Sequence, residues 1–201
     1  NARILHLGYL MLLDRLDSFE GGQTVAAKLL FNARSAGLET SVDMCSAMHP
    51  EFREIALSAL PMIDHLTINE IEAGLTVGEV IDPKNSGWLL RTAEQLLSLG
   101  VKQTVTIHTE HGAVCATADG LRLKQPSLKL PVGYSKGATG AGDAFAAGML
   151  FGLHERFEIQ ERLRLAVCCA AACLQDPTPS KGLRPVKDCL ALADQFGFGE
   201  F

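Results

Sequence analysis

A glycine-rich turn at residues 137–142 runs into an apolar stretch, and Asp143 lies where the two meet. Glycines let a backbone approach a ligand closely, and the free N–H groups of a helix's first turn attract anions. A phosphoryl group could therefore rest against Gly140-Ala141-Gly142. A carboxylate beside it would repel phosphate, unless Asp143 serves as a general base within about 3 Å of a substrate hydroxyl. The alternative is that Asp143 only favours the helix dipole.

Asn69 and Glu72 form a second candidate pair, three residues apart at the start of a helical pattern. Residues at this spacing share one helix face, so the two could hold waters around a Mg²⁺ that bridges the phosphates of ATP. The same spacing is typical of a helix cap, with Asn69 at the N-cap and Glu72 at the third helical position. Spacing alone leaves both interpretations open.

These residues need elements to position them, and short β-rich runs alternate with longer helical patterns along the chain. The alternation predicts an α/β fold with βαβ units around a mostly parallel sheet. Strands are expected at residues 3–7, 39–44, 64–68 and 103–108, then a hairpin of 113–118 and 121–124. Helices are expected at residues 24–35, 51–60, 86–99, 140–154, 159–175 and 186–196, with a short one from Asn69 that Gly74 ends. No linker divides residues 1–201, which are expected to form one domain.

Three further carboxylates follow strands. Asp43 ends the strand expected at residues 39–44, and ligands bind at such carboxyl edges in open α/β sheets, so Asp43 is expected to line the cleft. Asp14 and Asp17 follow the first strand and are expected in a solvated loop.

Composition excludes several classes of protein. Of the 201 residues 47% are hydrophobic, and 18 Lys+Arg against 23 Asp+Glu leave a net charge of −5 without a basic stripe. Nucleic acid is therefore not an expected partner. The apolar runs fall short of the roughly 20 residues that span a bilayer, so no membrane segment is expected. None of the six cysteines has metal-site spacing, which favours reduced thiols in a cytoplasm.

The string G-A-G-D-A-F-A-A-G at residues 140–148 resembles the C-terminal signature of the ribokinase-like (PfkB) carbohydrate kinases. In that family the Asp after G-A-G is the catalytic base and the turn is an anion hole. The resemblance thus implies a base at Asp143 and an anion hole at Gly140, Ala141 and Gly142. Asn69 and Glu72 resemble the family's N-x-x-E motif and imply a Mg²⁺ site. The implied fold has three α/β/α layers, with the mostly parallel sheet flanked by helices.

A weaker match to the family's nucleotide loop, T-x-G-x-x-G-A, surrounds Gly112, which fits the second glycine. Ile107 and Thr109 stand in place of its Thr and first Gly. Gly137 and Ala138 also depart from the family, which has an acidic or polar residue and a Thr before the turn. The residues expected to contact the nucleotide are Thr109, Gly112, Thr139, Gly140 and Gly142.

The resemblance implies ATP-dependent phosphorylation of a hydroxyl group on a sugar or sugar-like small molecule, with Mg²⁺, in the cytoplasm. Homodimerisation is left open. One alternative is a nucleoside or other small-alcohol kinase, since the motifs describe the phosphoryl donor and not the acceptor. Another is a non-catalytic relative that binds a nucleotide or sugar. Family members have roughly a hundred residues before this point, so the chain is expected to lack an N-terminal part and a lid. Gly21-Gly22 are not interpreted as the acceptor-binding glycine pair of that part.

Overall fold

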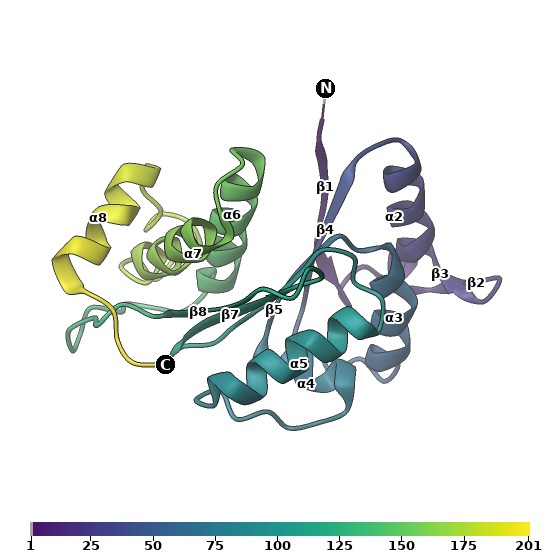
Figure 1. The fold of residues 1–201 in the computed structure, drawn as a ribbon, viewed down its shortest axis with the longest axis horizontal. Coiled ribbons are helices and arrows are strands. Elements are labelled where there is room, and N and C mark those ends of the chain that lie inside the picture. Colours follow the sequence, from purple (N-terminus) through teal and green to yellow (C-terminus); the bar gives the residue numbers. More distant parts are fainter. Residues whose placement is uncertain (1) are drawn as a thin grey trace. The chain divides into compact units, whose positions relative to one another are not determined.

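A computed structural model describes residues 2–201. The chain folds into two compact units (Figure 1). The N-terminal unit runs as far as His108 and includes Val114–Leu123, and the C-terminal unit comprises Thr109–Ala113 and Lys124–Phe201.

A six-stranded sheet has the strand order β1-β4-β5-β6-β7-β8. Its strands are β1 Ile4–Leu10, β4 Glu39–Met44, β5 His65–Asn69, β6 Thr104–His108, β7 Gly112–Thr117 and β8 Arg122–Pro126. Strands β1, β4, β5 and β6 pair in parallel, and β7 and β8 form the expected hairpin. The predicted α/β fold with a mostly parallel sheet is thus confirmed.

The helices of the N-terminal unit follow its strands in turn. They are α1 Asp14–Asp17, α2 Val25–Ser35, α3 Phe52–Ala59, α4 Glu70–Val77 and α5 Ser86–Ser98, with a 3₁₀ turn at Leu60–Met62. Helices α2, α4 and α5 pack against β4, β5 and β6, respectively. The hydroxyl of Thr76 on α4 lies 4.0 Å from the sulfur of Met44, which places α4 on the sheet face that carries Met44. Alternate strand residues on that face are apolar and fully buried, among them Val42, Leu66, Ile68, Val105 and Ile107. Burial of this apolar face provides the main stabilisation of the unit.

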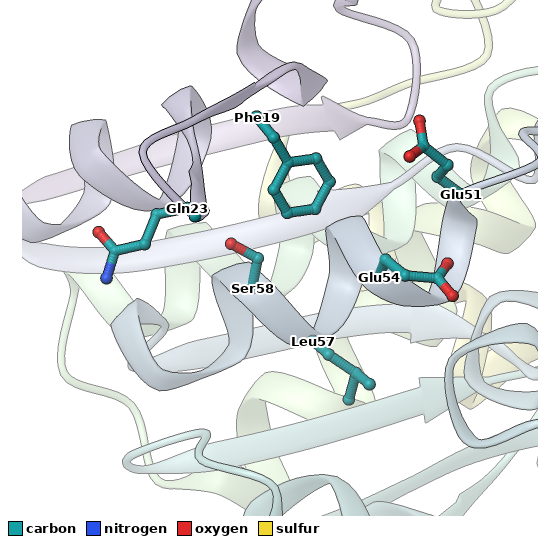
Figure 2. A pocket seen from close by; sticks show the side chains of 7 residues that line it. Phe19, Gln23, Glu51, Glu54, Leu57 and Ser58 are labelled. Carbon is teal, nitrogen blue, oxygen red and sulfur yellow. The ribbon is translucent and has the colours of Figure 1, made fainter.

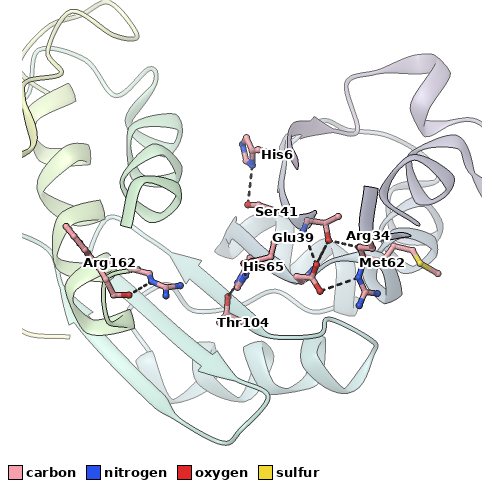
Figure 3. Close-up of polar contacts among 11 residues, drawn as sticks. His6, Arg34, Glu39, Ser41, Met62, His65, Thr104 and Arg162 are labelled. Carbon is pink, nitrogen blue, oxygen red and sulfur yellow. Dashed lines mark hydrogen bonds and ion pairs between the residues drawn. The ribbon is translucent and has the colours of Figure 1, made fainter. Parts of the chain in front are cut away.

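The intervening strand positions carry polar side chains that bond across the sheet (Figure 3). His65 is in register with Ser41 and Thr104, and its ring nitrogens bond to the Thr104 hydroxyl at 2.9 Å and to a Glu39 carboxylate oxygen at 3.1 Å. Between the neighbouring strands β1 and β4, the His6 ring bonds to the Ser41 hydroxyl at 3.2 Å. Because these partners satisfy buried polar groups, the sheet tolerates a polar face.

Two expectations for the N-terminal unit are wrong. Gly74 does not end the short helix, because α4 continues to Val77 and closes at Gly78, whose φ of 83° suits glycine. The carbonyl of Gly74 accepts the N–H groups of Gly78 and Glu79, and an added Cβ on Gly74 would lie 2.5 Å from the Glu79 carbonyl oxygen. Close backbone approach therefore explains this glycine.

Asp17 is the second correction, because it is buried and not in a solvated loop. Its carboxylate accepts the N–H groups of Met11 at 3.2 Å and Leu13 at 2.8 Å. Met11 has a φ of 80°, which is unfavourable for a residue with a side chain. These two hydrogen bonds hold the backbone in that conformation.

Gly21 and Gly22 form the turn of a separate small hairpin between β2 Phe19–Glu20 and β3 Gln23–Thr24. Both have positive φ, 64° and 82°, as a two-residue hairpin turn of the I′ type requires.

The C-terminal unit is built on three helices, α6 Ala141–His154, α7 Ile159–Cys173 and α8 Val186–Phe196. Helices α6 and α7 lie side by side (Figure 1). Their backbones are so close that a Cβ on Gly148 would lie 2.7 Å from the Cα of Ala166. The small, fully buried Ala166 permits this packing on α7. None of the helices in the described part of the chain is long and apolar enough to cross a membrane.

Candidate active site

The segment Gly137–Gly142, called the glycine turn below, leads into α6 and includes the first two residues of that helix. Gly140 begins the helix with a φ of 82° and no side-chain cap, and its carbonyl accepts the N–H of Ala144 at 2.8 Å. The N–H of Ala141 donates to the Ala138 carbonyl at 3.1 Å, so it is already used within the turn. The N–H of Gly142 bonds to none of residues 2–201 and is left for a ligand.

Asp143 lies in the first turn of α6 with an exposed side chain. Its carboxylate is close enough to the Cys173 thiol to act on it electrostatically. Burial and then the negative charges of Asp143 and Asp176 raise the pKa of that thiol. An exposed carboxylate at a helix N-terminus can receive a proton from a bound hydroxyl, while the neighbouring N–H group faces an anion.

Two glycines of the turn are needed because another segment packs directly against them. A Cβ on Gly137 would lie 3.0 Å from the Cα of Pro177. A Cβ on Gly140 would lie 2.2 Å from the carbonyl oxygen of Pro179. No side chain fits at Gly140 unless the backbone moves.

Asn69 and Glu72 form a capping box at the start of α4. The Asn69 side-chain oxygen accepts the N–H groups of Ile71 and Glu72, each at 2.9 Å, and the Glu72 carboxylate accepts the Asn69 N–H at 2.9 Å. Ser46 completes the cluster, because its hydroxyl donates to Glu72 at 2.8 Å and accepts from the Asn69 amide at 2.9 Å. The capping interpretation of the pair is therefore realised.

The Glu72 side chain is buried, which raises the pKa of its carboxyl, although the hydrogen bonds from Asn69 and Ser46 oppose the rise. Its two oxygens each accept one protein hydrogen bond, which leaves lone pairs for water. Among residues 2–201 no group of three or more His, Cys, Asp or Glu is arranged to hold a metal. Oxygen atoms of this kind fit a Mg²⁺ that keeps most of its waters.

Thr109 and Gly112 belong to one tight turn of the C-terminal unit. The N–H of Thr109 donates to the Gly112 carbonyl at 2.8 Å, and the Thr109 hydroxyl accepts the His111 N–H at 3.0 Å. A Cβ on Gly112 would lie 2.5 Å from the Gln125 carbonyl oxygen, so this glycine is required by packing. Thr139 is exposed in the glycine turn.

Within each unit the structure thus brings together part of the predicted set. Gly140, Gly142, Asp143 and Thr139 share the start of α6, and Asn69 and Glu72 share the start of α4. Asp43 is buried at the end of β4, where its carboxylate accepts the Met44 N–H at 2.8 Å. Sequence reasoning missed Ser46 and the segment around Pro179. Neither Ser46 nor Pro179 belongs to a periodic pattern or a motif, because both lie in loops.

A separate pocket of about 630 Å³ lies in the N-terminal unit (Figure 2). Its lining includes Phe19, Gln23, Glu51, Glu54 and Ser58. The pocket contains none of the predicted site residues and adds no chemistry to them.

Comparisons with known proteins address the family directly. The model of the pfkB family carbohydrate kinases matches residues 20–184. No curated protein matches the sequence. Similar solved structures include an Arabidopsis thaliana ribokinase with ribose and ATP, with a TM-score of 0.68, 23% identity, and coverage of 84% of this chain and 51% of that one. The phosphofructokinase-2 of Escherichia coli has a TM-score of 0.69 and 20% identity, and the match covers 96% of this chain and 57% of that one. A nucleoside kinase of Burkholderia thailandensis with inosine has a TM-score of 0.66 and 20% identity, and the match covers 87% of this chain and 54% of that one.

At these identities the solved structures show the fold alone. The chain spans a little over half the length of each of them. The family model, by contrast, covers most of the sequence, including both the Asn69–Glu72 cap and the glycine turn. The chain therefore belongs to the pfkB family of carbohydrate kinases.

Proposed function

We propose that the protein transfers the γ-phosphoryl group of ATP to a hydroxyl group of a sugar or sugar-like small molecule. The observation that carries the proposal is the start of α6, where an exposed Asp143 follows an uncapped glycine turn with an available N–H at Gly142. Membership of the pfkB family supports the same reaction class. The Arabidopsis thaliana ribokinase and the Escherichia coli phosphofructokinase-2 share its fold.

Asp143 is the general base in this proposal. Its carboxylate accepts the proton of the acceptor hydroxyl, whose oxygen forms a bond to the γ-phosphorus as the bond from that phosphorus to ADP breaks. The glycine turn stabilises the charge on the transferring group through the N–H of Gly142, which donates to no residue in the described part of the chain. Of the three anion-hole residues expected from the sequence, Ala141 contributes shape, because its N–H is bonded to Ala138.

Asn69 and Glu72 are proposed to hold water ligands of a Mg²⁺, with Ser46 fixing the Glu72 carboxylate. When bound, Mg²⁺ supplies charge neutralisation for the phosphates. The proposed nucleotide contacts are Thr109, Gly112, Thr139, Gly140 and Gly142. The Thr109 hydroxyl accepts the His111 N–H at 3.0 Å and donates to the Gly112 carbonyl at 3.4 Å, a long hydrogen bond that a phosphate oxygen would replace in this proposal.

Substrate class distinguishes this proposal from the alternative of a nucleoside or other small-alcohol kinase. The nucleoside kinase with inosine has the same fold, and the motifs in this chain concern the donor and the base. ADP formation by the full-length protein over a panel of sugars and nucleosides would separate the two. Nucleotide binding without ADP formation from any acceptor would instead favour a non-catalytic relative.

The variant Asp143→Asn tests the base. We expect kcat to fall by about 10²–10⁴-fold with nucleotide affinity nearly unchanged, because only proton transfer is lost. Asp188→Asn is the matched control, since Asp188 also lies in the first turn of a helix, α8. Both variants lose a carboxylate at a helix dipole, and only the first should lose turnover. An Asp143→Asn enzyme with wild-type kcat would refute the assignment.

A further inference from the structure

The loop that joins α7 to α8, residues 174–185, packs against the glycine turn. Its Leu174 carbonyl accepts the N–H of Lys136 at 2.7 Å. Pro177 and Pro179 contact the backbones of Gly137 and Gly140, as described above. The Cys173 thiol links the same segments, with its sulfur 3.2 Å from the Pro179 carbonyl oxygen and 3.8 Å from that of Thr139.

The contacting part of this loop, Asp176-Pro177-Thr178-Pro179, has little conformational freedom. Each proline fixes its own φ and restricts the residue before it to extended conformations. The remaining freedom is removed by the Asp176 carboxylate, which accepts the Thr178 N–H at 2.8 Å and the Thr178 hydroxyl at 2.5 Å. These two bonds, the hydroxyl first, lower the pKa of the Asp176 carboxyl. The result is an Asx turn that spans Asp176–Thr178, with Pro177 at its centre and Pro179 directly after it.

We propose that Asp176 is a positioning residue for phosphoryl transfer, a role that rests on the function proposed above. Asp176 acts by closing the Asx turn, which holds Pro177 and Pro179 against Gly137 and Gly140. Those contacts determine where the Gly142 N–H and the Asp143 carboxylate point. A displacement of about 1 Å at such groups can cost up to 10²-fold in rate, because the transition state depends on their alignment.

The proposal predicts a graded series of variants. Asp176→Ala opens the turn and should lower kcat about tenfold with little change in the KM for ATP, since alignment matters most in the transition state. Asp176→Asn should restore most of the activity, because asparagine also closes Asx turns. Thr178→Val removes the hydroxyl and keeps the N–H, so its kcat should lie between those of the other two.

The matched control is Asp82→Ala. Asp82 closes a similar turn by accepting the Lys84 N–H at 3.0 Å, but it lies in the N-terminal unit, on the loop between α4 and α5. This variant should lose a comparable hydrogen bond without a change in kcat. A wild-type kcat for Asp176→Ala would overturn the proposal. So would an Asp176→Asn enzyme as slow as Asp176→Ala, because charge and not turn geometry would then be responsible.

A second measurement does not depend on activity. Amide NMR spectra of the full-length protein, without ligand, should show shifts of Gly140 and Gly142 in Asp176→Ala and none in Asp82→Ala. Unshifted Gly140 and Gly142 amides would overturn the positioning role even if all variants are active. If the wild-type protein phosphorylates no acceptor, the proposed kinase function fails, while the spectra still decide whether Asp176 holds the turn. Should Asp176→Ala not fold, Thr178→Val and Asp176→Asn give the same two readouts.

Discussion

Replacement of Gly140 by alanine should destabilise the protein through two separable effects. The first is conformational, because Gly140 has a φ of 82°. An L-residue in this left-handed region costs about 1–2 kcal/mol. The second is steric, because the new Cβ would lie 2.2 Å from the Pro179 carbonyl oxygen and 2.7 Å from the Pro179 Cα. Both contacts are to backbone, so the α7–α8 loop must move, and overpacking of this kind costs about 1–3 kcal/mol.

Gly133→Ala isolates the first effect. Gly133 has a φ of 79°, in the same unit, and an added Cβ there meets no atom within 4 Å. We therefore expect Gly133→Ala to cost about 1–2 kcal/mol of unfolding free energy and Gly140→Ala about 2–5 kcal/mol.

Urea unfolding followed by circular dichroism gives both free energies of unfolding, provided that the free energy falls with urea concentration at the same slope in the two variants. The difference between them measures the contact with Pro179. If Gly140→Ala costs no more than Gly133→Ala, Pro179 does not restrain the glycine turn, and the structural basis for the role of Asp176 fails with it.

Two further variants or reagents test other parts of the structure. Glu72→Gln should weaken the use of Mg²⁺ and ATP and cost about 0.3–1 kcal/mol of stability, because a glutamine oxygen still accepts the N-cap N–H and only the negative charge at the helix N-terminus is lost. Glu161→Gln makes the same change in the capping box of α7 and should cost stability alone. Loss of stability in Glu72→Gln with an unchanged magnesium dependence of the rate would leave Glu72 as a cap only. A thiol reagent at neutral pH should modify Cys45 first, because the other five cysteines are buried and burial raises the pKa of Cys168 to about 11. Rapid modification of several thiols in the folded protein would contradict this arrangement.

Much of the local structure could be predicted from the sequence, because its causes are local. The strand at Glu39–Met44 and the helix at Val186–Phe196 have the predicted bounds, since apolar periodicity and nearby breakers define them. The Asn69–Glu72 cap likewise needs only residues three apart. The family resemblance was also available from a short string, G-A-G-D-A-F-A-A-G, and the family match confirms it.

Errors arose where a residue's role depends on a neighbour that the periodic pattern does not reveal. Residue type predicts a helix end at Gly74, whereas the structure requires a glycine there because a side chain would collide with the Glu79 backbone. The position of Asp17 after a strand predicts a solvated side chain, whereas its carboxylate accepts hydrogen bonds from a turn with positive φ at Met11. Glycine and aspartate are common in loops for several physical reasons, so residue type alone does not reveal which role Gly74 or Asp17 has.

The sequence by itself determined the alternation of strands and helices, the glycine turn before α6 and the carboxylate that follows it. Only the tertiary structure decided that Pro179 lies against Gly140 and that the Leu174 carbonyl accepts the Lys136 N–H. It also decided that Ala141 uses its N–H within the turn while Gly142 does not. Periodicity and capping arise from neighbours a few residues apart. The contact between the glycine turn and the α7–α8 loop exists only because α6 and α7 pack closely, and that packing brings distant segments together without leaving a pattern in either one.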